Sequence, residues 1–191
     1  MSNIIKPNTG LLFMKVGLHA GETFDQILER KKREYDAAGM IFWGYGGGTC
    51  HPSRVVQPFG RLSVEENNSD IYIVMEEINS RHPPSKIFAK EYSEDGLIWK
   101  PIPRGIEVRG SRYAVVLDEI KDGDLDLDLS QYHIANGPSQ GKAASGYIKG
   151  RVDKACIERT QAATGIKVVK PDIKKITHFA KIKNPYAVFT R

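Results

Sequence analysis

The sequence predicts an α+β protein in which a curved, mixed β-sheet or small β-barrel carries flanking helices. Three observations support this fold class. An apolar strand over residues 11–18 precedes a well-marked amphipathic helix and a second apolar strand. From residue 70 the chain changes to short β-prone runs separated by Gly, Pro and Asp-Gly turn signals. A second helix is expected over residues 151–164. The length of 191 residues, with no low-complexity linker, predicts a single domain over residues 1–191.

The first helix has the clearest signals in the chain. Thr23 and Gln26 have the spacing of a capping box, which satisfies two backbone N–H groups at a helix start. Apolar side chains then recur at helical intervals, with charged residues between them. Gly39 is typical of a helix end. We therefore expect a helix from Thr23 to Gly39, followed by a strand over residues 40–45.

The rest of the chain is expected to be mainly β. Asp95-Gly96 is a typical hairpin turn, and a second hairpin is expected around Gly110. A short helix is predicted over residues 62–67. The further strands that the pattern predicts are residues 71–75, 86–92, 97–100, 106–109, 113–120, 146–149, 166–169 and 186–190.

Residues 122–129 read Asp-Gly-Asp-Leu-Asp-Leu-Asp-Leu, and four alternating aspartates invite a calcium-site interpretation. The EF-hand pattern fails, because its sixth position requires Gly and its twelfth Glu, where this chain has Leu127 and His133. An edge strand with leucines inward and aspartates outward explains the alternation better. We therefore expect no metal site, and no zinc-type Cys or His spacing is present.

Charge is unevenly distributed along the chain. Residues 142–191 hold 12 Lys and Arg against 3 Asp and Glu, whereas residues 1–141 hold 16 against 20. A concentrated basic segment on a mildly acidic body indicates an anionic partner, with nucleic acid or a nucleotide first. The alternative is a solvated lysine-rich exterior.

Composition also bears on the compartment. No window approaches the roughly 18 apolar residues of a membrane span, and residues 1–10 lack the apolar core of a signal peptide. We therefore expect a cytoplasmic protein without a membrane partner. The two cysteines, Cys50 and Cys156, are too few for a disulfide framework and are expected to be free thiols.

The strand over residues 40–45 carries the main candidate binding residues. Alternation along a strand places Trp43 and Tyr45 on one face and Phe42 in the core under the helix. We expect Trp43 and Tyr45 to meet Trp99 and Tyr92 on the β-rich side. Aromatic rings placed in this way stack on a nucleic-acid base for about 1–3 kcal/mol each. The alternative interpretation is that these rings fill the core.

A glycine-rich loop follows this strand. Gly46, Gly47 and Gly48 allow close approach to the backbone, and successive N–H groups in such a loop can bind an anion. The pattern matches neither a Walker loop nor a dinucleotide fingerprint, so no cofactor is expected. Arg54 is the nearest of several arginines available to bind phosphate.

The loop ends at the only Cys-His dipeptide of the chain, which raises the possibility of an enzyme. Cys50 would be a thiol nucleophile, and it would need a base or cation to lower its pKa. His51 is adjacent in sequence, but neighbouring side chains seldom point toward each other. Another histidine would then be the base, and the sequence brings none of them near Cys50.

Four strand motifs follow one another in a characteristic order: Leu-Leu-Phe-Met-Lys-Val at 11–16, Phe-Trp-Gly at 42–44, Ile-Tyr-Ile-Val-Met at 71–75 and Tyr-Ala-Val-Val-Leu at 113–117. This order resembles the PUA-like superfamily, which includes the YTH, EVE and ASCH domains. The resemblance covers about residues 11–120. It implies a small curved β-barrel that binds RNA or modified bases in DNA. In YTH domains the Trp of a Gly-x-Trp strand lines a cage for a methylated adenine, and Trp43 is the matching residue here.

These observations predict a nucleic-acid or nucleotide-binding module that reads a modified base in an aromatic pocket. Trp43 and Tyr45 would stack on the base, and the basic segment 142–191 would supply salt-dependent affinity. The alternative is an enzyme with Cys50 as nucleophile, acting on a nucleotide-like or acyl substrate. A third possibility is an inhibitor or adaptor that uses its basic segment on a protein partner. The oligomeric state and RNA-versus-DNA preference stay open.

Overall fold

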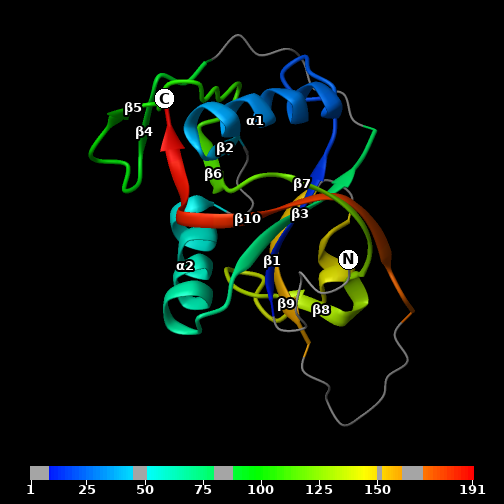
Figure 1. Cartoon of the computed structure of the whole chain (residues 1–191). Helices are drawn as coiled ribbons and strands as arrows, with labels where there is room; N and C mark the ends of the chain where they lie inside the picture. The colour runs from blue at the N-terminus through cyan, green and yellow to red at the C-terminus, as the bar shows by residue number, and fades with distance from the viewer. Residues whose placement is uncertain (1–8, 45–50, 80–87, 150–151, 161–169) are drawn as a thin grey trace.

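The sheet of this protein is mixed and open. A computed structural model describes residues 9–44, 51–79, 88–149, 152–160 and 170–191 (Figure 1). Within these residues ten strands form one sheet, whose main path runs β2-β6-β10-β3-β1-β9-β8. The α+β class and the mixed sheet are thus confirmed. The sheet does not close into a barrel, because its two end strands, β2 and β8, do not pair with each other.

The N-terminal elements follow the sequence prediction closely. They are β1 (Gly10–Val16), α1 (Phe24–Ala38) and β2 (Ile41–Gly44). Thr23 and Gln26 form the expected capping box, with both reciprocal hydrogen bonds present. Gly39 ends α1 in the left-handed conformation (φ 67°), and its N–H donates to the Tyr35 carbonyl at 2.8 Å.

The helical segment between β2 and β3 is longer than predicted. A π-helical turn (Pro52–Val56), α2 (Gln57–Gly60) and a second π-helical turn (Arg61–Glu66) run consecutively, and the last contains most of the helix predicted over residues 62–67. β3 (Ile71–Glu77) comes next and pairs in parallel with β1.

Only one of the two predicted hairpins forms. β4 (Glu91–Ser93) pairs with β5 (Lys100–Pro101) across the Asp-Gly turn, as expected. Both strands are shorter than predicted: residues 89–90 of the expected strand 86–92 and residues 97–99 of the expected strand 97–100 are not in a strand. Residues 106–109 form no named strand, so the hairpin around Gly110 is wrong. β6 (Tyr113–Leu117) pairs instead with β2 and β10, because distant apolar strands satisfy its two edges.

The second half of the chain contains two corrections. Its elements are β7 (Lys121–Asp128), a 3₁₀ turn (Leu129–Gln131), β8 (Tyr132–Ile134), α3 (Ala144–Tyr147), β9 (Lys154–Arg159) and β10 (Ile173–Thr190). The strand predicted over residues 146–149 overlaps the short helix α3. The helix predicted over residues 151–164 is wrong for residues 152–160, the part that the structure describes. Most of these residues form β9, which pairs with β1 and β8. Ala155, Cys156 and Ile157 are consecutively buried, which a helix cannot do with one apolar face.

β7 has the alternation that the sequence predicts. It pairs with β10 at the edge of the sheet. Leu127 is buried and Leu125 half-buried, whereas Asp122, Asp124 and Asp126 are exposed. In the described part of the chain, no group of three His, Cys, Asp or Glu side chains is placed to hold a metal ion. The strand predicted over residues 166–169 lies outside the described residues.

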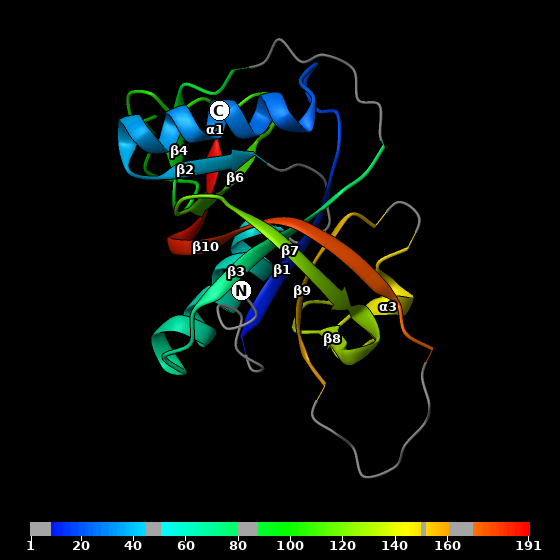
Figure 2. The ribbon, with the colours of Figure 1, turned by 45° about the vertical axis from the view of Figure 1, so that its right-hand side comes forward.

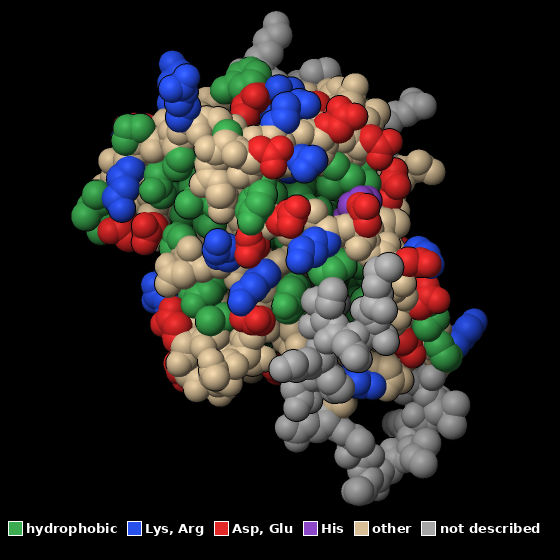
Figure 3. Space-filling model, viewed as in Figure 1, with side chains coloured by type: hydrophobic (Ala, Val, Ile, Leu, Met, Phe, Trp, Pro, Cys, Tyr) green, Lys and Arg blue, Asp and Glu red, His purple; other side chains and the backbone are tan. Residues whose placement is uncertain are grey.

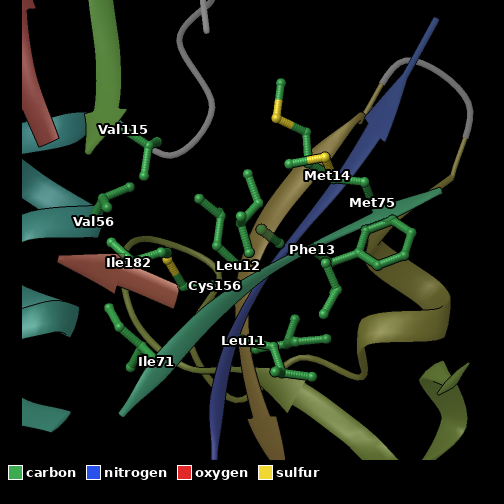
Figure 4. Packing of buried hydrophobic residues seen from close by; sticks show 14 of the residues in the cluster. Leu11, Leu12, Phe13, Met14, Val56, Ile71, Met75, Val115, Cys156 and Ile182 are labelled. Carbon is green, nitrogen blue, oxygen red and sulfur yellow. The ribbon is translucent and has the colours of Figure 1, made fainter. Parts of the chain in front are cut away.

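The elements divide between the two ends of the sheet. α1 lies across one end beside β2 and β6, and β8 and α3 lie at the other (Figures 1 and 2). Between them the main core is built on β1, whose Leu11, Leu12, Phe13 and Met14 are buried against the neighbouring strands (Figure 4). A smaller core around Phe42 lies under the β4–β5 region.

Several cations of the basic segment pair with acidic residues from elsewhere in the chain. On β10, Lys175 pairs with Asp124, Lys181 with Asp70 at 2.6 Å, and Lys183 with Asp118 at 3.9 Å; Arg191 beyond it pairs with Glu91. On the face seen in Figure 3, acidic and basic side chains are interspersed. The charge asymmetry of the sequence therefore does not become a single basic patch on this face.

No helix in the described ranges combines the length and apolar character that crossing a membrane requires.

Candidate functional site

A cavity of about 370 Å³ opens where the parallel strands β1 and β3 end. Met14–Val16 of β1 and Ile78, just after β3, form one wall. β9 runs antiparallel to β1, so its first residue, Lys154, reaches the same edge. Ile27 of α1 and the end of β2 close the opposite side.

Trp43 forms part of the cavity wall, although only 3% of its surface is exposed. Its Nε1–H is buried and has no hydrogen-bond acceptor among the described residues. Burying an N–H without a partner costs about 1–3 kcal/mol. The indole thus lines the cavity and also contains a buried donor without a described partner.

The polar wall of the cavity is strongly cationic. Its cationic side chains are Lys15, Arg30, Lys31, Arg109 and Lys154. The described carboxylates that pair with them are Glu22, Glu34, Glu107 and Asp153. The lining itself holds all five of these cations and one carboxylate, that of Asp153.

A buried ion network supports the α1 side of the cavity. Arg30 binds Glu22 through its Nη2 at 2.7 Å and Glu34 through its Nη1 at 3.0 Å. Lys31 Nζ donates to both Glu34 carboxylate oxygens at 2.8 Å. Both cations also donate to the Glu107 carbonyl, and the Glu107 N–H donates to Glu34. α1 is thereby joined to the segment that carries Arg109.

Burial dominates the ionisation of this network. Removal of Lys31 from water lowers its pKa to about 8, although the charge of Glu34 opposes this shift. Burial likewise raises the pKa of Glu34 against the attraction of Lys31. At Glu22, burial acts to raise the pKa, but the hydrogen bond and charge of Arg30 prevail and lower it.

The lowered pKa of Lys31 predicts a pH-dependent stability. Between pH 8 and 10.5 the folded protein has lost the Lys31 proton that the unfolded chain still holds. Unfolding then takes up a proton, so this residue makes stability rise with pH, by up to ~1.4 kcal/mol per pH unit. We expect Lys31→Met to remove this contribution. Urea unfolding of both proteins at pH 7.5, 8.5 and 9.5 measures the two slopes, and equal slopes would contradict the prediction.

Among the described residues, Trp43, Tyr92 and Trp99 do not form the predicted aromatic cluster. Trp43 faces the main core and the cavity, whereas Phe42 faces the smaller core. Tyr92 packs edge-on against Phe42, with ring centroids 5.2 Å apart. Trp99 lies under the Arg191 guanidinium, 4.0 Å from the ring centroid. The two faces of β2 are therefore exchanged relative to the prediction, because Ile41 and Trp43 share the side that packs on the main core.

The other candidate residues lie away from the cavity or outside the described residues. Tyr45, Gly46, Gly47, Gly48 and Cys50 belong to the second group. Gly44, which precedes them, lines the cavity.

Arg54 is exposed on the first π-helical turn and does not line the cavity. His51 packs edge-on against Tyr113 at 5.0 Å and Phe189 at 6.1 Å. Its Nδ1 lies 3.1 Å from the Ser53 hydroxyl. The described contacts of His51 are thus those of a packed aromatic ring.

Sequence reasoning missed four of the five cations of the cavity, and Arg109 was only one of several arginines that it offered for phosphate binding. Lys15 lies in the apolar β1 motif, and Arg30 and Lys31 look like the solvated face of α1. A signal was available for Lys15, since a single charge inside a buried strand requires either an edge or a polar site. Nothing local marks Arg109 or Lys154, which reach the cavity only through the fold.

Comparison of the chain with protein-family models, with curated proteins and with solved structures gave no match.

Proposed function

We propose that this protein is a nucleic-acid or nucleotide-binding module, and that the cavity beside Trp43 receives one nucleotide unit. The observation that carries the proposal is a cavity lined by five cations and by Trp43, whose buried indole N–H has no acceptor among the described residues. The resemblance of the strand motifs to PUA-like domains supports the same class of ligand.

The size and composition of the cavity suit a small planar ligand. Its volume of about 370 Å³ lies within the usual range for small-molecule sites, about 300–1,000 Å³. Met14, Val16, Ile27 and Val108 supply apolar walls, and the donors are few and fixed. Apolar walls with a few placed polar groups are typical of sites that orient one ring system.

The charge of the cavity favours an anion. Arg109 pairs with Glu22 at 3.1 Å and with Glu107, which holds its guanidinium in place at the cavity. A preorganised cation of this kind binds phosphate without paying for its own ordering. The base would occupy the apolar part beside Trp43, and the phosphate would lie toward the cations.

Trp43→Phe is expected to weaken ligand binding about three- to tenfold, because the ring is kept while one buried hydrogen bond, worth about 0.5–1.5 kcal/mol, is lost. Calorimetric titration with nucleoside 5′-monophosphates and with short single-stranded DNA and RNA measures the change. Trp99→Phe is the matched control, since Trp99 does not line the cavity. Equal losses in the two variants, or no binding by the unmodified protein, would contradict the proposal.

A further inference from the structure

Phe88 is an aromatic residue that is open to solvent beside the cavity. It is 51% exposed, and it is the only exposed aromatic residue in the described ranges, where the others are buried or half-buried. A single exposed apolar side chain is common on protein surfaces and needs no explanation by itself. The significance of Phe88 comes from the residues that lie next to it.

The position of Phe88 is set by its pairing with the segment that lines the cavity. Phe88 forms an isolated antiparallel bridge with Arg109, and the Ala89 N–H donates to the Val108 carbonyl at 3.0 Å. Val108 and Arg109 both line the cavity. The Arg109 guanidinium carbon lies 5.5 Å from the centroid of the Phe88 ring. The ring therefore lies at the rim of the cavity, next to one of its cations.

Arg109 is held in place between the cavity and the ring. Its Nη1 pairs with Glu22 at 3.1 Å, and its Nε pairs with Glu107. Its Nη2 forms no ion pair within the described ranges, so the N–H groups of this nitrogen remain for an entering phosphate oxygen. The cation–π contact with Arg109 also orients the Phe88 ring. Phe88 and Arg109 thus offer a flat apolar surface beside a fixed phosphate donor.

We infer that Phe88 is a stacking platform for a second base, so that the ligand is a single strand of at least two nucleotides. This inference rests on the proposed function and names its ligand more closely. One base occupies the cavity, Arg109 binds the phosphate that links the two nucleotides, and the neighbouring base stacks on Phe88. The two bases are splayed apart, as is usual where proteins recognise unpaired bases.

The chemistry of the platform predicts which strand it accepts. Stacking on an aromatic side chain is tolerant of sequence, because every base has a π-face. The base on Phe88 is therefore expected to be read weakly, whereas the base in the cavity is enclosed by fixed walls. In a duplex, both bases would first have to leave their pairs and their stacked neighbours, which costs free energy. Single strands are therefore favoured over duplexes.

Calorimetric titration with three kinds of probe tests the inference, each in DNA and in RNA form. They are nucleoside 5′-monophosphates, 5′-phosphorylated dinucleotides, and the same dinucleotides with one of the two bases removed. Intact and abasic dinucleotides carry the same charge, so their difference isolates the second base. We expect the intact dinucleotide to bind about tenfold more tightly than either abasic form. Equal affinity of intact and abasic dinucleotides would overturn the inference.

Substitution of Phe88 assigns the contact. Phe88→Ala should weaken binding of the intact dinucleotide about tenfold and leave the affinity for the monophosphate unchanged, whereas Phe88→Trp should keep the affinity for both. Leu62→Ala is the matched control, because Leu62 is 49% exposed and does not line the cavity. Equal losses for monophosphate and dinucleotide in Phe88→Ala would show that the ring only positions Arg109. No loss would assign the ring to another contact, such as a protein surface. Either result would refute the stacking platform.

The same titrations separate this inference from the proposed function. If monophosphates bind but intact dinucleotides bind no more tightly than abasic ones, the inference fails and the proposed function stands. If neither monophosphates nor dinucleotides bind, the proposed function fails and the inference fails with it. A short single strand should also bind more tightly than its duplex, and equal affinity would contradict the requirement for unpaired bases.

Discussion

Replacement of Glu34 by Ala is expected to lower the free energy of unfolding by about 3–5 kcal/mol, the range for breaking a buried ion pair by removing one partner. Glu34 is 1% exposed and accepts from Arg30, from Lys31 and from the Glu107 N–H. Its removal leaves two cations buried with fewer acceptors. The loss also weakens the connection between α1 and the segment that carries Arg109, so the cavity is affected as well.

Urea unfolding at pH 7 measures this loss. Asp36→Asn is the matched control, because Asp36 lies on the same helix and pairs with Lys32 at 3.9 Å with both side chains more than half exposed. An exposed pair of this kind contributes about 0.3–0.5 kcal/mol. Glu34→Gln keeps an acceptor of the same shape and should lose less than Glu34→Ala. A loss below about 1 kcal/mol for Glu34→Ala would show that the network does not stabilise the fold.

Gly60→Ala is expected to destabilise the protein by ~2 kcal/mol, as over-packing of a filled site usually does. A Cβ at Gly60 would lie 2.4 Å from Tyr186 Cγ and 2.6 Å from Cδ1. The Tyr186 ring cannot easily move, because it is 2% exposed and its hydroxyl donates to Glu65 at 3.0 Å. Gly60 ends α2, where Ala is otherwise the better helix former by up to ~1 kcal/mol.

Gly146→Ala is the matched control for this clash. Gly146 lies in the short helix α3, and a Cβ there meets nothing within 4 Å. This substitution should therefore be neutral or stabilising in the same urea titration. If both variants unfold at the same urea concentration as the unmodified protein, the close packing of Tyr186 on α2 is refuted.

Local signals allowed parts of the fold to be predicted from the sequence. The helix α1 has a capping box and a left-handed C-terminal glycine, both determined by residues within the helix or next to it. The β4–β5 turn is similar: Asp95 accepts from the N–H groups of Leu97 and Ile98, which also lowers its pKa to about 2. The alternation of Asp and Leu in β7 likewise needs no distant partner to be recognised.

Features set by distant contacts were not predictable. β9 looks like a helix because Val152 and Cys156 are four residues apart, but its pairing with β1 buries consecutive residues on both faces. The faces of β2 were exchanged for a related reason. Alternation shows that Phe42 and Trp43 point to opposite sides, but it does not show which side holds the larger core.

In the candidate site, too, one part could be predicted from local sequence and the other part could not. Trp43 was identified from the aromatic and glycine-rich segment that contains it. The charges around it come from β1, α1, the segment before β6 and the start of β9, which are far apart in the sequence. No spacing pattern links Lys15 to Lys154, although Met14 and Lys154 are directly paired residues of neighbouring strands.

β10 has a consequence for how the protein is made. It pairs with β3, β4, β6 and β7, all of which precede it in the chain. During translation these strands leave the ribosome before their common partner, so their open edges are exposed in the nascent chain. Such edges are prone to join other chains. The yield of native protein in the cell would then depend on how quickly β10 is synthesised and paired. A chaperone that covers the open strand edges until then would have the same effect.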